Sequence, residues 1–539
     1  MRSRHWRVAL LACGAMSLAS ALPRAARAQA LLPATGADVR LGDLRQQYER
    51  AFQSEPPAST PGWSFTPALD VLLGWTDAIQ GTTTGRTRSD FYTIISPSLA
   101  IQGQSQRVTA SVFIAPQLKR YLATRSQDST GLNFNGQSHV TLVPEMLFVD
   151  LRGASFMQSQ TGGYGPAGTV NLGRQGEVQS TNFSISPYLQ HRFGGYGMGE
   201  IGYMLGYNSI TGANRRLTSP FQPPVTNQNT ITRGWHVSFA SGENLGRFNL
   251  AAQVLHNEST GTGSLNGAHR NTESVTLGYA VTRTIQVNGT IGHEDLQYIG
   301  ATPFRFNGLT WNVGLKLQPN PDSSISIGYG SHDGRNSAAL DASYAPTARI
   351  RISAKYSEGI TTGQEELAQA LAGSDVNGFG QSIDHQTGIP LSVGNNFLGS
   401  QTAPARVKRF SAVITLLRDR DVYSLNLLHS DTQYVAAVSG PAVGSAISST
   451  ASSVGLAWQH SFSEAFNGNV YAQYGTRESG APTRVTQQTV SASLGLSYAF
   501  SQTLSGRAQY SYSGTIGGGN ALVPSYQQNL ITVGLHKSF

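Results

Sequence analysis

The chain has 539 residues and a formal net charge of +8, yet charged residues make up only 13% of it and glycine occurs 60 times. Beyond the N-terminus, no apolar run reaches the roughly 18 residues of a membrane-spanning helix. This composition, with polar residues spread between apolar ones, favours strands over helices and argues against helical membrane proteins and soluble helical enzymes.

The first 28 residues have the pattern of a secretory signal peptide. A basic start precedes an apolar stretch from Val8 to Leu22 and the small-residue site Ala26-Arg27-Ala28, which predicts cleavage before Gln29. The segment carries five arginines and no acidic residue, so its removal lowers the net charge from +8 to +3. The basic balance is therefore no argument for nucleic-acid binding. Cleavage also removes Cys13, the single cysteine, which excludes disulfides and thiolate metal sites.

Residues 29–61 are predicted to form a periplasmic N-terminal segment. Apolar residues recur at helical spacing between Val39 and Phe52, which indicates a short amphipathic helix that the following prolines end. The segment is either a periplasmic cap, an arm in the mouth of a barrel, or a disordered leader.

Residues 62–539 are predicted to be one domain of about 22 antiparallel strands, from Gly62 to Phe539. Runs of alternating apolar and polar residues are joined by connections that are short and long in strict turn, as in an outer-membrane barrel with short periplasmic turns and long extracellular loops. Val108, Ala110 and Val112, for example, alternate with Thr109 and Ser111. A sheet with one lipid-facing side must close on itself, because only closure pairs every backbone group in hydrocarbon.

The last run predicts the strand that closes this barrel and that the barrel-assembly machinery meets. One face carries Ile531, Val533, Leu535 and the terminal Phe539, as expected of a lipid-facing strand ending at the aromatic boundary. Lys537 interrupts that face, but a long basic side chain at a membrane edge can reach water.

Several basic residues are predicted on the wet face, and five of them form the candidate basic strip: Lys316, Arg349, Arg351, Lys355 and Arg409. The strip either favours anions or polysaccharide in the lumen, or consists of ordinary wall charges paired with acids such as Asp341.

The longest connection, Gly363 to Ala405, contains the helix-like segment Gln364–Leu371 after Thr361 and Thr362 as candidate caps. It is either a constriction folded inward or an outer lid.

Aromatic residues near strand ends are predicted to form interface girdles. They include Trp75, Tyr92, Tyr121, Phe193, Tyr196, Tyr207, Phe500, Tyr512 and Phe539. Tyr188, on the wet face, is instead a candidate for stacking against a sugar.

We expect no catalytic site, metal or cofactor. The histidines are dispersed without metal-helix spacing, and calcium loops and nucleophile elbows are absent from the sequence. A membrane hydrolase built from residues on adjacent strands remains an alternative.

Short segments in order along most of the chain resemble the β-barrel porins found with exopolysaccharide and PEP-CTERM sorting loci of Gram-negative bacteria. They are Trp75-Thr-Asp77, Ser89-Asp-Phe91, Ser96-Pro97, Glu145-Met-Leu-Phe-Val-Asp150, Ser186-Pro-Tyr-Leu-Gln-His-Arg-Phe193, Gly292-His-Glu-Asp295, Gly328-Tyr-Gly330 and Gly334-Arg-Asn-Ser337. Leu189 departs from the pattern, which has a larger aromatic there. The resemblance implies an outer-membrane barrel that serves assembly or export of an envelope polysaccharide, and it supplies no catalytic residues.

The sequence thus predicts an outer-membrane conduit or accessory for a surface exopolysaccharide. The alternatives are a general diffusion porin for small solutes and a non-conducting structural or adhesive barrel. The expected partners are outer-membrane lipid, the barrel-assembly machinery, and polysaccharide with periplasmic export components.

Overall fold

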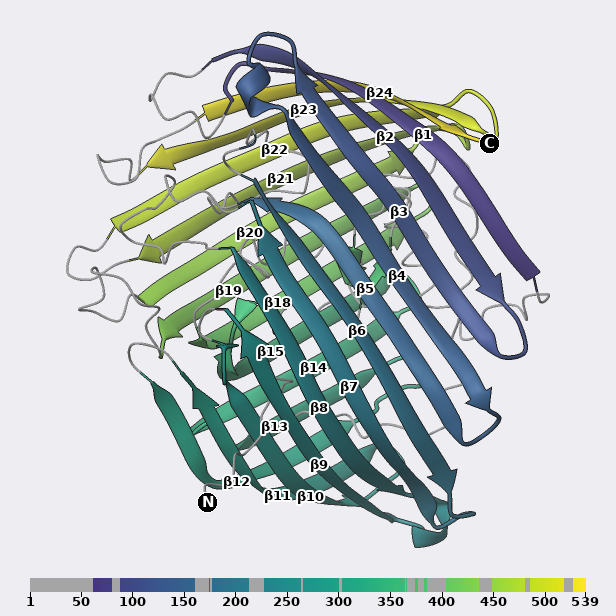
Figure 1. Cartoon of the computed structure of the whole chain (residues 1–539), viewed down its shortest axis with the longest axis vertical. Helices are drawn as coiled ribbons and strands as arrows, with labels where there is room; N and C mark the ends of the chain where they lie inside the picture. Colours follow the sequence, from purple (N-terminus) through teal and green to yellow (C-terminus); the bar gives the residue numbers. More distant parts are fainter. Residues whose placement is uncertain are drawn as a thin grey trace.

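Alternation of apolar and polar residues along nearly every strand produces a sheet with two unlike faces, and in the computed structural model this sheet closes on itself (Figure 1). The structure describes residues 62–79, 88–159, 174, 177–212, 227–262, 265–299, 303–363, 365, 374–376, 382–384, 404–435, 448–479, 485–517 and 527–539. The predicted signal peptide, the N-terminal segment and most of the predicted Gln364–Leu371 helix lie outside these residues.

The first half of the wall consists of β1 (Gly62–Thr76), β2 (Asp90–Gln104), β3 (Val108–Tyr121), β4 (Ser129–Val143), β5 (Leu147–Ser159), β6 (Glu177–Arg192), β7 (Gly197–Thr211), β8 (Gln228–Ser241), β9 (Phe248–Gly261), β10 (His269–Ala280) and β11 (Ile285–Tyr298). The second half consists of β12 (Phe304–Leu317), β13 (Ser324–His332), β14 (Arg335–Thr347), β15 (Ile350–Thr361), β18 (Ala405–Arg418), β19 (Asp421–Tyr434), β20 (Ser448–Ser461), β21 (Phe466–Ser479), β22 (Val485–Ala499), β23 (Leu504–Gly517) and β24 (Gln527–Ser538). Outside the wall lie two short 3-10 turns, η1 (Arg125–Gln127) and η4 (Glu243–Leu245), and the small hairpin β16 (Ser374–Val376) and β17 (Ser382–Asp384).

The barrel has 22 strands, and the pairing of its first and last strands confirms the predicted closure. β1 pairs antiparallel with β24 from Ala68 opposite Ser538 to Thr76 opposite Leu530. No helix in the described ranges is long and apolar enough to cross a membrane.

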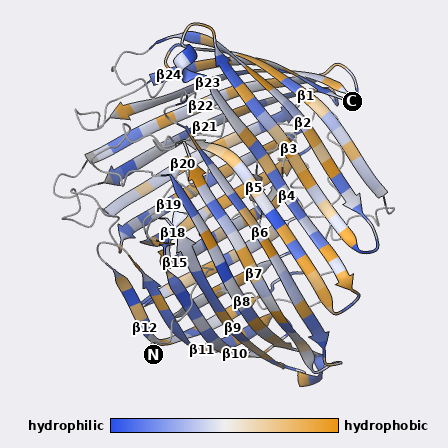
Figure 2. Ribbon diagram, viewed as in Figure 1, coloured by the Kyte–Doolittle hydropathy of each residue, from blue (hydrophilic) through white to orange (hydrophobic). Residues whose placement is uncertain are grey.

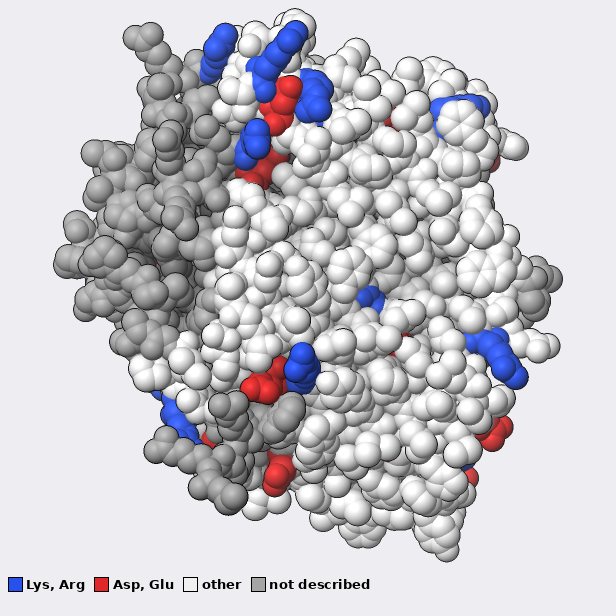
Figure 3. Space-filling model, in the orientation of Figure 1, with Lys and Arg blue, Asp and Glu red and all other residues white. Residues whose placement is uncertain are grey.

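The outer face is apolar and the inner face polar, as the alternation predicts. On β24, Ile531, Val533 and Leu535 are 46–54% exposed, whereas Thr532 on the other face is 7% exposed. Figure 2 shows the same alternation along the strands, and Figure 3 shows a broad outer belt nearly free of charged side chains between two more highly charged ends. Such a belt matches the hydrocarbon layer. Lys537 turns its Nζ to Thr503 Oγ1 at 2.7 Å, at the end that carries the short turns, which fits the expected snorkelling.

Two girdle predictions were wrong. Tyr92 and Tyr121 are 5% and 3% exposed and lie on the inner face, where they pack with Ile79 and Leu530. Phe193, Tyr196, Phe500 and Phe539 are more than half exposed near the periplasmic turns, as a girdle requires. Position near a strand end therefore does not identify a girdle residue unless the face is also known.

The predicted strict alternation of short and long connections fails most clearly between β13 and β14. His332 pairs with Arg335, so the extracellular connection is the two-residue turn Asp333-Gly334, with φ of 50° and 77°. Positive φ at both central residues is typical of the type I′ turn that an Asp-Gly pair favours. Because of this tight turn, the β13–β14 hairpin extends less far towards the extracellular side than the adjacent strands β12 and β15.

Because the β13–β14 hairpin is short, the wall divides above it, a feature we call the β12–β15 seam. Backbone pairing of β12 with β13 starts only at Trp311, and pairing of β15 with β14 starts only at Tyr356. Above the hairpin, the outward face of β15 packs on the lumen face of β11, since Ile360 joins a buried cluster with Leu296 and Tyr298. The end of β15 thus lies inside the end of β11.

Side chains replace the missing backbone ladder at this seam. The Ile360 amide donates to Asp333 Oδ2 at 2.8 Å, and His332 Nε2 forms a hydrogen bond with the Glu358 carbonyl at 2.5 Å. Asp333 Oδ1 also accepts from Arg270 Nη2 at 2.6 Å, and Arg270 is only 6% exposed. Burial alone would raise the pKa of Asp333, but Arg270, His332, the Ile360 amide and Arg406 together outweigh this effect and hold the pKa below its usual range.

A second, smaller division, the β4–β5 seam, has the same construction. Pairing of β4 with β5 extends only to Phe134 opposite Ser155. Beyond it, the Gln179 side-chain amide acts as a strand partner: its Oε1 accepts from the Leu132 amide at 3.0 Å and its Nε2 donates to the Leu132 carbonyl at 2.8 Å. β5 curves strongly at this end (Figure 1).

The buried guanidinium of Arg270 has two charged partners, Asp333 and Glu294. Replacement of Asp333 by Asn removes one of them and should destabilise the barrel by about 1.5–3 kcal/mol. Asn has nearly the same shape as Asp and tolerates the positive φ of position 333. Urea unfolding in detergent measures the change. Asp322→Asn in an exposed periplasmic turn is the matched control and should change stability by less than about 0.5 kcal/mol. Equal effects of the two variants would contradict the role of Asp333.

Above the seam, Glu365 and Thr362 form the reciprocal pair of a capping box, with Thr362 as one of the predicted caps. The Thr362 amide donates to Glu365 Oε2 at 2.8 Å, the Glu365 amide donates to Thr362 Oγ1 at 3.3 Å, and Tyr298 Oη donates to the Glu365 carboxyl at 3.1 Å. Burial raises the pKa of Glu365 to about 7.

Because the folded pKa of Glu365 lies above the unfolded value, the protonated form stabilises the fold. This stability is fully present below about pH 4.5 and is lost as the pH rises through about 7. A difference of this size corresponds to about 3 kcal/mol. The melting temperature in detergent should therefore fall more between acid and alkaline pH in the native protein than in Glu365→Gln. Parallel pH profiles would argue against the buried carboxyl.

Candidate functional site

Four of the five residues of the predicted basic strip lie on the lumen face, on β15, on its neighbour β18 and on β12, which is three strands from β15. Arg351 and Lys355 on β15 share the face opposite Ile350 and Ile352, and Arg409 on β18 and Lys316 on β12 also face inward. Arg349 differs, because it lies exposed in the periplasmic turn before β15.

The strip also contains one acid. Asp341 on β14 stands directly opposite Lys355 in the strand register, and Arg351 Nη2 donates to Ser343 Oγ at 3.3 Å. Counted over the described residues of β12 to β18, four cationic groups of the strip face inward with one carboxylate, so the strip can attract anions or anionic groups of a polymer.

A second group of inward side chains, the luminal aromatic cluster, was not assembled by sequence reasoning. It comprises His139 on β4, Phe148 and Asp150 on β5, Tyr188 on β6, Glu200 on β7 and His236 on β8. All six lie close to the periplasmic turns. Tyr188 was recognised as a wet aromatic, but its neighbours come from four other strands.

The rings of the cluster form a continuous surface. Phe148 and Tyr188 stack with centroids 5.3 Å apart and an interplanar angle of 26°, and His139 stacks on Phe148 at 5.4 Å. Offset stacks of this kind present flat apolar faces with polar edges.

A histidine and a carboxylate flank the rings on each side. His139 Nδ1 lies 2.7 Å from Asp150 Oδ1, and His236 Nε2 lies 2.8 Å from Glu200 Oε1. These four side chains remain 25–31% exposed, so they are accessible to a solute in the lumen. They supply donors and acceptors suited to hydroxyl groups.

Gly202 allows the two halves of the cluster to meet. It pairs with Tyr188 on one side and with His236 on the other. A Cβ at this position would come within 2.3 Å of the His236 ring and 2.9 Å of Tyr188 Cβ. Any larger residue would therefore push these side chains apart.

Two further histidines pair with carboxylates: on the lumen face, His536 Nδ1 lies 3.1 Å from Asp70 Oδ2, and on the outward face, near the periplasmic turns, His460 Nδ1 lies 2.8 Å from Asp421 Oδ1. Across the described ranges, no three His, Cys, Asp or Glu side chains gather closely enough to hold a metal ion. These histidines and carboxylates are thus arranged in pairs, and those on the lumen face can interact with a solute through hydrogen bonds and charge.

No family model matches the chain, and no curated protein matches it. Among solved structures, the FrpB iron transporter from Neisseria meningitidis (F5-1 variant, apoprotein form) aligns over 88% of this chain and 81% of its own, with 9% identity and a TM-score of 0.50. The fold is that of an outer-membrane β-barrel.

Two other solved barrels align less closely. The ferric-catecholate import receptor Fiu from E. coli K12, in its open form, covers 90% of this chain and 82% of its own, with 10% identity and a TM-score of 0.46. OccK1 (OpdK) from Pseudomonas aeruginosa covers 88% and 99%, with 7% identity and a TM-score of 0.35. At these identities the likeness concerns the fold alone.

Reversing the charge of the strip with Arg351→Glu and Lys355→Glu should shift ion selectivity towards cations, because the local wall charge changes sign. The reversal potential across a salt gradient in a planar bilayer measures this shift. Arg349→Glu, exposed in the turn, is the control and should shift the potential less. If the double variant and the native protein have the same reversal potential, the strip does not select ions.

Proposed function

We propose that the protein is an outer-membrane conduit, or an accessory to one, for export of a surface exopolysaccharide. The luminal aromatic cluster is the observation that supports this proposal best. Flat rings can lie against the apolar face of a sugar, while the flanking His–carboxylate pairs exchange hydrogen bonds with its hydroxyl groups.

The place of the cluster suits entry of a polymer. It lies on five consecutive strands next to the short turns, so a chain arriving from the periplasm would meet it first. A surface of several partly exposed rings binds successive sugars weakly and at many points, which lets a polymer advance without being trapped.

A diffusion channel for small solutes is the second candidate, and the basic strip favours it. Lys316, Arg351, Lys355 and Arg409 face inward with Asp341 as the acid in their midst. A wall with such a charge excess concentrates small anions from solution. This function needs no aromatic surface.

Deletion of the gene from the producing bacterium should separate the two functions. A conduit predicts that polymer accumulates in the periplasm and is lost from the cell surface, whereas a diffusion channel predicts normal surface polymer with slower uptake of small solutes. Normal export after deletion would refute the conduit.

Loss of the flat rings should impair export while the barrel stays intact. Tyr188→Leu with Phe148→Leu keeps apolar volume but removes the stacking surface, which is worth about 0.5–1.5 kcal/mol for each aromatic contact. Surface polymer should fall and periplasmic polymer should rise, as measured by fractionation and sugar analysis. Tyr203→Leu on the lipid face of β7, 43% exposed, is the matched control and should export normally.

A further inference from the structure

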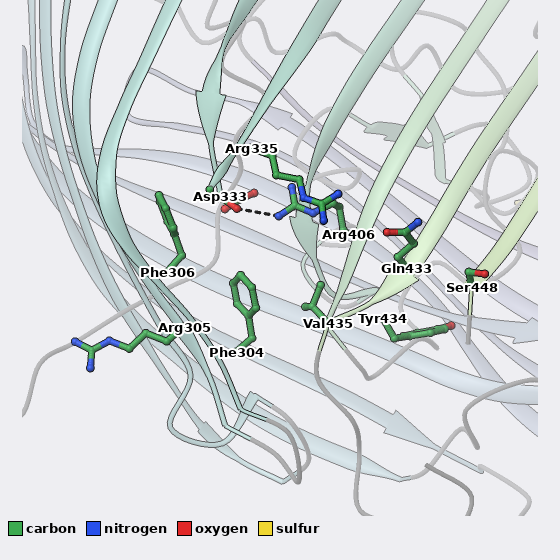
Figure 4. A pocket seen from close by; sticks show the side chains of 11 residues that line it. Phe304, Arg305, Phe306, Asp333, Arg335, Arg406, Gln433, Tyr434, Val435 and Ser448 are labelled. Atoms are coloured by element: carbon green, nitrogen blue, oxygen red, sulfur yellow. Dashed lines mark hydrogen bonds between the residues drawn. The ribbon is translucent and has the colours of Figure 1, made fainter. Parts of the chain in front are cut away.

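The β12–β15 seam forms an open cavity of about 560 Å³ at the extracellular end of the wall. Its two sides are the lumen face of β12, with Phe304 and Phe306, and the outward face of β18 and β19, with Arg406 and Val435 (Figure 4). Arg335, directly after the Asp333-Gly334 turn, lines the same cavity. The cavity exists because the short hairpin leaves this part of the wall open between two overlapping edges.

One side of the cavity carries two guanidinium groups close together. Figure 4 shows the side chains of Arg335 and Arg406 next to each other, above the apolar residues. Arg406 Nη2 donates to the Asp333 carbonyl at 2.8 Å, and its Nη1 is 3.8 Å from Glu358 Oε1. The side chain of Arg335 makes no hydrogen bond or ion pair with any residue in the part of the chain that the structure describes, although its backbone pairs with His332.

The nearby carboxylates are already engaged. Asp333 binds Arg270 at 2.6 Å and the Ile360 amide at 2.8 Å, and Glu358 is also shared with Lys408 at 3.9 Å. Positive charge therefore exceeds negative charge where Arg335 and Arg406 converge. Two adjacent arginines with planar donor groups are a favourable receptor for a phosphate.

The opposite side of the cavity is apolar. Phe304 and Phe306 pack against the buried cluster that contains Leu296 and Tyr298, and Val435 reaches the same cluster from the side of Arg406. Lower on β12, Leu309 is 62% exposed on the lipid face, so the cavity lies just above the hydrocarbon belt. A ligand that matches the two arginines, the apolar side and a position just above the hydrocarbon belt has a phosphate group joined to an apolar body.

We propose that this cavity binds a phosphate-bearing amphiphile, with the phosphate on Arg335 and Arg406 and the apolar part against Phe304 and Phe306. The phosphate group can belong to a glycolipid of the outer leaflet or to a soluble phosphate ester with an apolar part, for which inorganic phosphate is the simplest probe. The proposal is independent of the polymer-export function, because the aromatic cluster lies near the other end of the barrel.

The test measures binding to the purified full-length barrel in a non-ionic detergent, with diphosphoryl lipid A, its fully dephosphorylated form and inorganic phosphate as probes. Native mass spectrometry counts bound lipid, and calorimetry measures phosphate. Arg335→Gln should weaken binding about tenfold or more, because a charged hydrogen-bonding partner is lost. Arg335→Lys should restore part of it, since the charge returns without the planar fork.

Arg305→Gln is the matched control, because Arg305 neighbours Phe304 but its side chain extends away from the two arginines (Figure 4). Heat-modifiable migration on gels checks that each variant is folded. Arg335-dependent binding of lipid A alone identifies a membrane lipid as the ligand, and Arg335-dependent binding of inorganic phosphate identifies a soluble source. Absence of binding by every probe, equal binding by Arg335→Gln, or equal binding of the dephosphorylated lipid would overturn the proposal.

Discussion

Every backbone amide that faces hydrocarbon must find a partner within the protein, and this constraint determines the architecture. Around most of the barrel the neighbouring strand is the partner, which is why β1 must pair with β24. The effect of this constraint is seen most clearly where the backbone pairing between strands ends. At both seams a side chain occupies the place of a strand: the Gln179 amide at Leu132, and the Asp333 carboxylate at Ile360.

These substitutions allow the wall to overlap instead of remaining a simple cylinder. At the β12–β15 seam, the overlap brings the outward face of β15 against the lumen face of β11, and a buried pair of opposite charges, Arg270 and Asp333, connects the two layers. Burying such charges is costly unless each has partners. Here Asp333 and Glu294 both bind Arg270, so the overlap is held by groups that also restrict how far it can open.

The strands and their two faces could be predicted from sequence because the lipid and the lumen impose opposite polarities on alternate residues. The seams could not be predicted, because nothing in the alternation of apolar and polar residues marks Gln179 or Asp333 as unusual. Only the strand register shows where a backbone hydrogen-bonding partner is missing. Two local signals were nevertheless present. The Asp333-Gly334 pair indicates a two-residue hairpin, and Thr362 with Glu365 matches the spacing of a capping box.

The candidate sites show the same limit. The basic strip could be predicted because Arg351 and Lys355 are two pleats apart on one strand. The aromatic cluster requires five strands to be aligned: His236 and Glu200 are 36 residues apart, and Tyr188 meets His236 only across Gly202. The alternation of apolar and polar residues predicts which face of the sheet each side chain occupies. It does not predict the register between neighbouring strands, which decides which side chains lie next to each other.

The relative positions of the two inward-facing groups link the proposed functions to the fold. β6, in the middle of the aromatic cluster, is nine and ten strands from β15 and β18 in a ring of 22, so the rings and the part of the basic strip on β15 and β18 lie on nearly opposite walls. A solute that touches only the strip is selected by charge, which suits small ions. A sugar polymer long enough to extend across the lumen can stack on Phe148 and Tyr188 while its acidic groups approach Arg351 and Lys355. Under the proposed export function, the wall would distinguish a polymer from an ion by whether both sides are engaged at once.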